Sequence, residues 1–193
     1  MAGAEGYPRR RRLGREPTGE PESASPPADA DPREVAREIA LRRLEQRAHT
    51  RAELRTAMLA RGTPEAVADE LLDRFEQVGL VDDAAFAQAW TASRAGVRHF
   101  SRRAVVQELR RKGVDDDLIA DATVGIDREA ELIGATQVAA AKRKTLVGLA
   151  YPVAYRRLAG ALARKGYGPD VVPEVVRQAL AGWAEPDGDG DTG

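Results

Sequence analysis

Residues 50–62 read TRAELRTAMLARG, and two further segments of this 193-residue chain repeat their pattern. Residues 101–113 read SRRAVVQELRRKG and residues 154–166 read AYRRLAGALARKG, so the three segments align without gaps. Each has an apolar residue at its fifth and ninth positions and ends in a basic residue followed by glycine, with spacings of 51 and 53 residues between the glycines. Self-similarity at a nearly fixed period is typical of repeat architectures. The sequence therefore predicts a tandem array of similar units.

The first of these segments carries the signals of a helix at both ends. Thr50 is a favourable N-cap, and Glu53 three residues later completes a capping box. Apolar residues four apart form one buried stripe between them. The final glycine can adopt the left-handed conformation that stops a helix, and the basic residue before it suits the negative helix C-terminus. Ser101 can cap the second copy in the same way, although Ala104 cannot complete the box.

Further helices are predicted on both sides of each segment. A new helix should begin directly after each glycine. Thr63 is the expected cap of the first of these helices, before Pro64, and Asp115 is the expected cap of the second. Pro169 is expected at the first helical position of the third. A helix should also precede each segment, because apolar residues recur there at helical spacing. The predicted preceding helices cover residues 33–47, 83–95 and 128–147.

The predicted fold is therefore all-α, with three tandem three-helix repeats that form an elongated, curved helical array. A unit of about 50 residues buries too little apolar surface to be secure alone, so neighbouring units are expected to stack. The predicted repeats are residues 33–81, 82–127 and 128–183. Residues 1–32, which contain four consecutive arginines at 9–12, and the acidic residues 184–193 lack apolar periodicity and are expected to be disordered tails.

Composition argues against most kinds of catalytic site. The chain has no cysteine and only two histidines, His49 and His99, so thiol chemistry and a His-rich metal site are excluded. No phosphate-binding loop, nucleophile elbow or zinc-protease motif occurs. The acidic run at 115–117 is a possible metal-binding triplet, but carboxylates at a helix start are also favoured by the helix dipole. We therefore expect a protein that is not an enzyme and has no catalytic, cofactor-binding or metal-binding residues.

The same composition bears on where the protein works. No apolar run approaches the roughly 20 residues that span a bilayer. The arginines near the N-terminus are not followed by the apolar segment of a signal peptide. We therefore expect a cytoplasmic protein without membrane association.

The net charge of −1 conceals an uneven distribution. Residues 33–183 hold 25 Lys and Arg against 21 Asp and Glu, because the tails are acidic. Arg103 and Arg110 lie seven residues apart and share one helix face, and Arg157 and Arg164 repeat that spacing in the third unit. Basic faces in consecutive units would form a stripe that is typical of polyanion-binding proteins. The alternative interpretation is that these are ordinary solvated helix faces.

The candidate DNA-binding or protein-binding residues are the basic side chains of the second and third repeats. They are Arg94, Arg98, Arg102, Arg103, Arg110, Arg111, Lys112, Lys142, Arg143, Lys144, Arg156, Arg157, Arg164 and Lys165. Tyr151, Tyr155, Tyr167 and Trp183 are concentrated in the third repeat, where some are expected to be core residues and others to anchor an interface.

Three stretches of the sequence resemble the RecX family, which regulates the RecA recombinase. They are HTRAELRTAMLARG at 49–62, GLVDDAAFAQAWTASR at 79–94 and SRRAVVQELRRKGVDDDLI at 101–119. The most specific pattern is Val-Asp-Asp-x-x-Phe-Ala-x-x-Trp-x-x-x-Arg, which runs from Val81 to Arg94. The resemblance covers residues 33–183 and is looser in the third repeat.

The resemblance implies three tandem three-helix repeats, in agreement with the repeat pattern, and it implies a function. RecX-like proteins bind the RecA–DNA filament, block its extension or promote its disassembly, and so lower ATP hydrolysis, strand exchange and the coprotease activity that triggers the SOS response. They are pictured in the filament groove, in contact with more than one RecA subunit, and can bind DNA directly. Only Arg94 and the basic-residue–glycine positions carry over, and a structural role for them is also open.

The main hypothesis is therefore a RecX-like regulator whose partners are the RecA filament and single-stranded or double-stranded DNA, acting as a monomer without a cofactor. A general DNA-binding helical module that acts independently of RecA is the alternative, with the turns between units as helix–turn–helix pairs. A scaffold that binds only proteins is a third possibility. The sequence leaves open which repeat contacts RecA and which contacts DNA.

Overall fold

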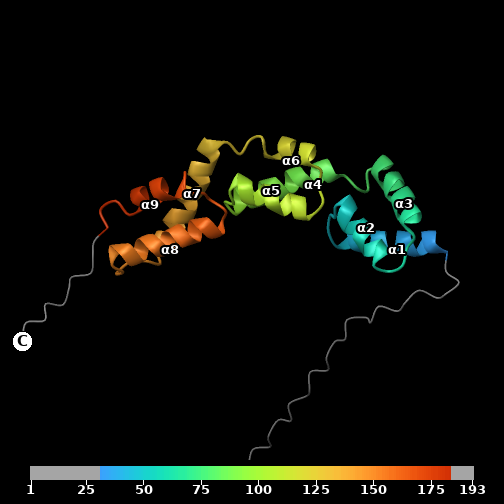
Figure 1. Cartoon of the computed structure of the whole chain (residues 1–193), viewed down its shortest axis with the longest axis horizontal. Coiled ribbons are helices and arrows are strands. Elements are labelled where there is room, and N and C mark those ends of the chain that lie inside the picture. Colours follow the sequence, from blue (N-terminus) through green and yellow to red (C-terminus); the bar gives the residue numbers. More distant parts are fainter. Residues whose placement is uncertain (1–30, 184–193) are drawn as a thin grey trace, which may run out of the picture. The chain divides into compact units, whose positions relative to one another are not determined.

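The computed structural model describes residues 31–183, and the predicted tails, including the arginine run at 9–12, lie outside the described residues. Within residues 31–183 the chain forms nine α-helices and one short π-helix, and contains no strand (Figure 1). This confirms the predicted all-helical fold class. The first group of helices is α1 (Pro32–Gln46), α2 (Arg51–Leu59) and α3 (Glu65–Gln77). The second is α4 (Asp83–Thr91), the π-helix η1 (Ala92–Val97), α5 (Arg102–Arg111) and α6 (Asp116–Thr123). The third is α7 (Arg128–Arg143), α8 (Tyr151–Arg164) and α9 (Val172–Ala179).

Each group of helices encloses a hydrophobic cluster of its own. Leu54 and Met58 of α2 are fully buried in the first cluster, and Val105 and Leu109 of α5 are fully buried in the second. Leu158 of α8 and its neighbour one turn on, Leu162, occupy the same place in the third cluster. These are the fifth and ninth positions of the repeated segment. The middle helix of each group therefore supplies the centre of its core.

The predicted helix starts are confirmed wherever a polar cap was expected from Thr50, Ser101 or Asp115. The Thr50 hydroxyl accepts a hydrogen bond from the Glu53 amide, and the Glu53 carboxylate accepts one from the Thr50 amide, which completes the capping box. The Ser101 hydroxyl accepts from the Ala104 amide, and the Asp115 carboxylate from the Asp117 amide. These local signals predict correctly because each cap needs only residues two or three positions away.

Other predicted boundaries are wrong. Thr63 does not cap α3, because the helix begins after Pro64 and the Thr63 hydroxyl is buried without a hydrogen-bond partner. Pro169 lies in a turn, and α9 begins three residues later with Pro173 in its first turn. The helix predicted to 147 ends at Arg143, which frees Leu146 to pack as a buried side chain of the following turn.

Two features, near the start of the third group and at the end of α4, were not predicted from the sequence. Helix α8 begins at Tyr151, three residues before the repeated segment, and has no side-chain cap at Ala150. Helix α4 continues into the π-helix η1, a form that is rare and often marks a functional position. No helix within residues 31–183 is long and apolar enough to cross a membrane.

Candidate nucleic-acid and protein interface

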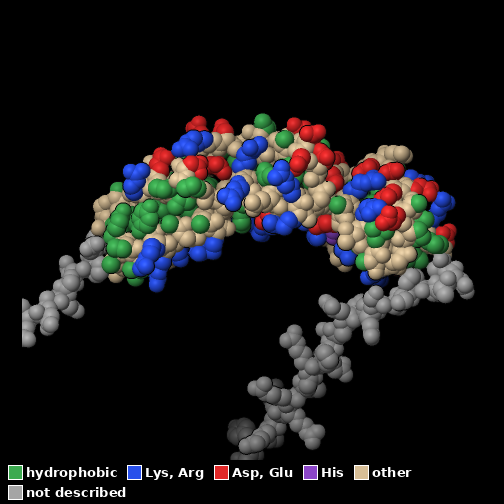
Figure 2. Space-filling view, viewed as in Figure 1, with side chains coloured by type: hydrophobic (Ala, Val, Ile, Leu, Met, Phe, Trp, Pro, Cys, Tyr) green, Lys and Arg blue, Asp and Glu red, His purple; other side chains and the backbone are tan. Residues whose placement is uncertain are grey.

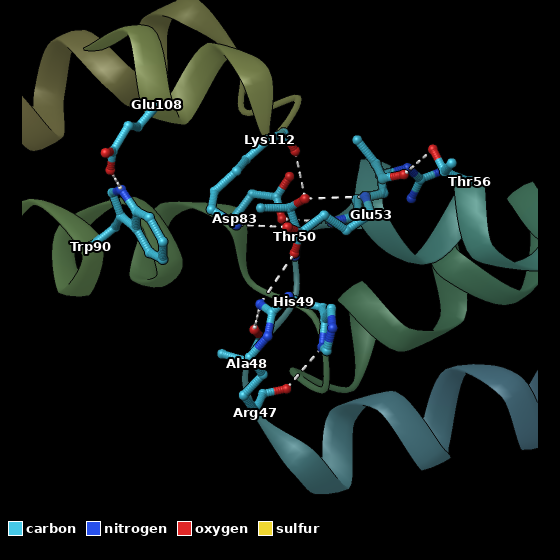
Figure 3. Close-up of polar contacts among 12 residues, drawn as sticks. Arg47, Ala48, His49, Thr50, Glu53, Thr56, Asp83, Trp90, Glu108 and Lys112 are labelled. Carbon is cyan, nitrogen blue, oxygen red and sulfur yellow. Dashed lines mark hydrogen bonds and ion pairs between the residues drawn. The ribbon is translucent and has the colours of Figure 1, made fainter. Parts of the chain in front are cut away.

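Two equivalent joints hold the three helix groups to one another. At the first joint, the end of α5 meets the start of α2: the Thr50 hydroxyl donates to the Lys112 carbonyl at 2.6 Å, and the Lys112 ammonium lies 2.6 Å from the Glu53 carboxylate (Figure 3). Gly113 packs so closely that a Cβ there would overlap the side chain of Ala52. The predicted helix stop of the repeat is therefore also the contact between two repeats.

At the second joint the end of α8 meets the start of α5, through different hydrogen bonds. The Ser101 amide donates to the Lys165 carbonyl at 3.0 Å, and the Lys165 ammonium donates to the Arg98 carbonyl at 2.7 Å. A Cβ on Gly166 would lie 2.5 Å from the Ser101 hydroxyl oxygen and 2.6 Å from the Ala104 Cβ. The Lys-Gly pairs of the second and third repeats therefore have structural roles.

Arg94, at the end of the most specific pattern, is also held by internal contacts. Its guanidinium lies 2.7 Å from the Glu108 carboxylate and 4.4 Å from the centre of the Trp90 ring. The Trp90 ring nitrogen donates to the same carboxylate at 2.9 Å (Figure 3). The Arg94 and Glu108 side chains are only 20% and 18% exposed. The aromatic and charged residues of the pattern thus brace α4 against α5.

Several other candidate basic residues make contacts within the chain. The Arg110 guanidinium lies 2.8 Å from the Asp116 carboxylate, and Arg102 donates to the Thr123 carbonyl at 3.3 Å. Arg143 lies over the Trp183 ring at 5.3 Å. Lys142 is half-buried. The remaining candidates are exposed and have no side-chain partner within residues 31–183: Arg98, Arg103, Arg111, Lys144, Arg156, Arg157 and Arg164.

The exposed arginines of α5 and α8 fall at equivalent positions of the repeat. When the glycines that end the two segments are matched, Arg103 corresponds to Arg156 and Arg111 to Arg164. The seven-residue pairs expected from the sequence do not occupy equivalent positions, and Arg110 is paired with an acid. Residues eight apart lie about 80° from each other around a helix, so each pair occupies one exposed side. We call these four arginines the basic stripe.

The first helix group lacks this feature. The positions of α2 that correspond to the stripe are Ala52 and Ala60. In Figure 2, Lys and Arg side chains of the third group gather along the lower edge beneath α8, and hydrophobic side chains lie above them. The exposed arginines at equivalent repeat positions therefore belong to the second and third groups, and their role in binding stays a prediction.

A hollow of about 510 Å³ lies between the first and second helix groups. Its walls are mainly apolar and come from the end of α1, the turn before α4, and α4 with η1. The wall residues include Leu44, Leu80, Phe86, Ala89, Trp90 and Ser93. We call it the apolar groove. Sequence reasoning did not find it, because its walls come from segments up to 49 residues apart, from Leu44 to Ser93. Phe86 and Trp90, four apart on one helix, and the apolar Leu80 after a glycine were the only signals in the sequence.

A second hollow, of about 470 Å³, lies beside the first and is lined by basic side chains. Arg43, Arg47, Arg110, Arg111 and Lys112 contribute to it, against the single acid Glu53. Arg47 and His49 line both hollows. We call it the basic hollow.

The titratable groups at the first joint have shifted pKa values. Burial lowers the pKa of His49, whose Nδ1 donates to the Arg47 carbonyl at 3.0 Å. Burial alone would raise the pKa of Glu53, but the hydrogen bond and charge of Lys112 outweigh it and hold that pKa below its usual range. Burial raises the pKa of Asp83, which accepts a hydrogen bond from the Arg51 amide across the joint.

Comparison with known proteins gives a consistent result. Residues 36–75 match the family model described as RecX, first three-helix domain, and residues 82–122 match RecX, second three-helix domain. A regulatory protein RecX from Streptomyces coelicolor is 47% identical over 159 residues, which are 82% of this chain and 84% of the relative. One from Mycobacterium avium is 44% identical over 84% of this chain and 96% of its own length.

Solved structures show the same fold. The crystal structure of RecX from Lactobacillus salivarius aligns with a TM-score of 0.66 at 16% identity, over 78% of this chain and 98% of that one. A second crystal structure, of a regulatory protein RecX, aligns with a TM-score of 0.64 at 20% identity, over 77% of this chain and 72% of that one. The three-helix groups of the chain thus have counterparts in experimental structures.

Proposed function

The chain belongs to the RecX family of regulatory proteins, and we propose that it binds the RecA–DNA filament and inhibits RecA activities. The inhibited activities are filament extension, ATP hydrolysis, strand exchange and the coprotease function, so that the chain modulates recombinational repair and the SOS response. The identity of 42–47% with RecX proteins over more than four fifths of the chain is the observation that carries the proposal. The chain acts as a cytoplasmic monomer without catalysis or cofactor.

The basic stripe supports a direct contact with DNA. Arg103 and Arg111 on α5, and Arg156 and Arg164 on α8, are exposed side chains with no carboxylate partner in the described chain. Exposed guanidinium groups in repeated positions suit a phosphate backbone, whose charges also repeat. Binding of this kind releases counterions and weakens steeply with salt. The stripe therefore contributes affinity for DNA without sequence preference, whether single-stranded or double-stranded.

A DNA-dependent RecA ATPase assay tests the main proposal. We expect ATP hydrolysis to fall as the chain is added to RecA filaments formed on single-stranded DNA. Full ATPase activity at a large excess of the chain would contradict the proposal. If the chain then still bound DNA, a general DNA-binding module that acts without RecA would be the better description.

Charge reversal tests the stripe. The variant carries Glu at all four stripe positions: Arg103, Arg111, Arg156 and Arg164. We expect it to bind DNA at least tenfold more weakly at low salt. Its salt dependence should also be shallower, because each missing phosphate contact reduces the number of counterions released on binding by about one.

The matched control for this test reverses four exposed arginines of the first helix group: Arg37, Arg42, Arg61 and Arg74. It changes net charge by the same amount, so a general charge effect would weaken DNA binding equally in both variants. Helicity measured by circular dichroism should match the wild type in both. Equal DNA affinities of the two variants would remove the stripe from the mechanism.

A further inference from the structure

The aromatic side chains of the apolar groove are held in place by contacts within the chain. The central side chain, Trp90, is fixed at several points: the ring nitrogen donates to Glu108, and the Arg94 guanidinium and the Lys112 ammonium each lie 4.4 Å from the ring centre. Phe86 stacks on Trp90 with ring centres 5.6 Å apart. An aromatic wall held in this way loses little conformational entropy when a partner binds.

The opposite wall leaves apolar surface open to solvent. Leu80 is 49% exposed, and it follows Gly79, whose φ of +72° sets the turn that presents it. Ala85 and Ala89 are exposed along the same side of α4, so the small side chains leave room above the rings. A concave apolar site with aromatic walls is typical of a pocket that receives one large side chain of a partner.

The basic side chains beside the groove favour an occupant that carries negative charge. Arg47 is 53% exposed and lies at the boundary between the groove and the basic hollow. Glu53 is paired with both Lys112 and Arg47, whereas Arg43 and Arg111, exposed on the far side of that boundary, have no acidic partner in the described chain. A segment that enters the groove therefore meets uncompensated positive charge as it leaves, and this favours a carboxylate next to the apolar side chain.

Nucleic acid is a poorer fit to the groove. Among the residues that line it, Arg47 is the only Lys or Arg, and Asp82 contributes a negative charge. The phosphate contacts that dominate nucleic-acid affinity require several cations along the backbone. The stripe on α5 and α8 provides such cations, and the groove does not.

We infer that the apolar groove receives a large apolar side chain from a protein segment of the filament, and that the basic hollow receives a carboxylate of the same segment. This inference rests on the proposed function for the identity of that protein, a RecA subunit. The groove and the basic hollow, between the first and second helix groups, then provide the protein contact, while the stripe on α5 and α8 provides the DNA contact. Arg111 belongs to both the stripe and the hollow, where the two surfaces meet.

A pair of neighbouring substitutions on α4 tests the groove. Ala89→Glu places a charge inside it, whereas Gln88→Glu adds the same charge at an exposed position of the same helix outside the groove. Binding to filaments preassembled on single-stranded DNA and binding to bare DNA are both measured, with circular dichroism as the check on folding. We expect Ala89→Glu to weaken filament binding at least tenfold and Gln88→Glu to change it less than twofold, with bare-DNA affinity unchanged in both.

A second pair tests the basic hollow. Arg43→Glu reverses a charge that lines the hollow, and Arg42→Glu reverses its neighbour on the same helix, which does not line it. We expect only Arg43→Glu to weaken filament binding, by three- to tenfold. Equal effects of the two reversals would contradict the carboxylate contact.

Cross-linking identifies the occupant directly. Because the chain contains no cysteine, Ser93→Cys in the groove and Gln107→Cys between the arginines of the stripe each accept a single photoreactive label. We expect the label at 93 to attach to RecA and the label at 107 to attach to DNA. Attachment to DNA from position 93, or filament binding by Ala89→Glu equal to that of Gln88→Glu, would overturn the inference. A wild-type chain that does not bind the filament at all would overturn the proposed function as well.

Discussion

At the first joint the ammonium group of Lys112 lies beside a carboxylate, whereas at the second joint the ammonium group of Lys165 lies beside a backbone carbonyl. At both joints a left-handed glycine closes on the start of the preceding middle helix, although the Lys112 carbonyl accepts from the Thr50 hydroxyl and the Lys165 carbonyl from the Ser101 amide. Their electrostatics differ, because Glu53 is replaced by Ala104 at the corresponding position. A repeated backbone contact therefore does not require a repeated ion pair.

The missing acid at the second joint gives Lys112 and Lys165 different surroundings. The Lys112 ammonium is held between Glu53 and the Trp90 ring. The Lys165 ammonium lies 4.1 Å from the centre of the Phe100 ring, and burial together with the charges of Arg98 and Arg94 lowers its pKa. The first joint thus gains stability from an ion pair, whereas the second carries a partly buried charge that only neutral groups contact.

The glycines at the joints provide the largest expected effect. Gly113→Ala and Gly166→Ala each place a Cβ into the neighbouring helix group at a residue with φ of +75° or +90°. We expect each to reduce the free energy of unfolding by about 2–4 kcal/mol, from left-handed strain and overpacking together. Urea unfolding followed by circular dichroism measures this change.

Gly62→Ala is the matched control for both substitutions. Gly62 has the same left-handed conformation, with φ of +82°, but nothing in the described chain lies within 4 Å of a Cβ there. We expect Gly62→Ala to reduce the free energy of unfolding by about 1 kcal/mol. Left-handed strain destabilises the folded chain, and the lower conformational entropy of the unfolded chain offsets part of that cost. A cost equal to that of Gly113→Ala would show that the close approach at the joints adds nothing.

Removal of the two lysines compares the joints directly. Lys112→Met leaves the Glu53 carboxylate, which is 22% exposed, without its main partner, and should cost about 1–2 kcal/mol. Lys165→Met removes a charge that has no acid partner and should cost less than about 1 kcal/mol. Urea unfolding of both variants, and of Glu53→Gln with Lys112→Met in a double-mutant cycle, checks the difference. Equal costs would mean that the ion pair does not distinguish the joints.

The smallest expected effect is the pH dependence that His49 gives the first joint. Because burial holds its pKa below the ordinary value of about 6.5, the unfolded chain binds the proton more readily, and stability should fall as pH decreases from about 7 to 5. His49→Gln removes this contribution, so its stability should fall less over the same range. Thermal unfolding at several pH values compares the two proteins, and parallel curves would assign the pH dependence to other groups.

The sequence predicts those parts of the fold that depend on neighbouring residues. Thr50 with Glu53, and Ser101 with Ala104, define their helix starts through contacts three residues apart, and both were correct. The glycines were correctly interpreted as helix stops. The start of α8 was missed, because Ala150 provides no side-chain cap and the local signal, Pro152 in the first turn, was not used.

The candidate interface was harder to predict, because its features depend on residues far apart in the chain. Lys112 and Glu53 are 59 residues apart, and nothing in either segment indicates that they pair. A basic residue on a helix looks the same in sequence whether it is exposed like Arg103 or braced by an acid like Arg94. The region rich in positive charge was predictable, but the side chains that remain available to a partner were not.

The glycine that ends α2 occupies the same position in its repeat as the two glycines at the joints, yet no preceding helix group of the described chain covers it. Gly62 already has the left-handed conformation that the other two glycines use, and it follows Arg61 as they follow a lysine. An additional three-helix unit whose middle helix begins with a Thr or Ser cap has a ready docking point there. We expect that a unit grafted before the first helix group would lengthen the array, because Gly62 has room for such a contact.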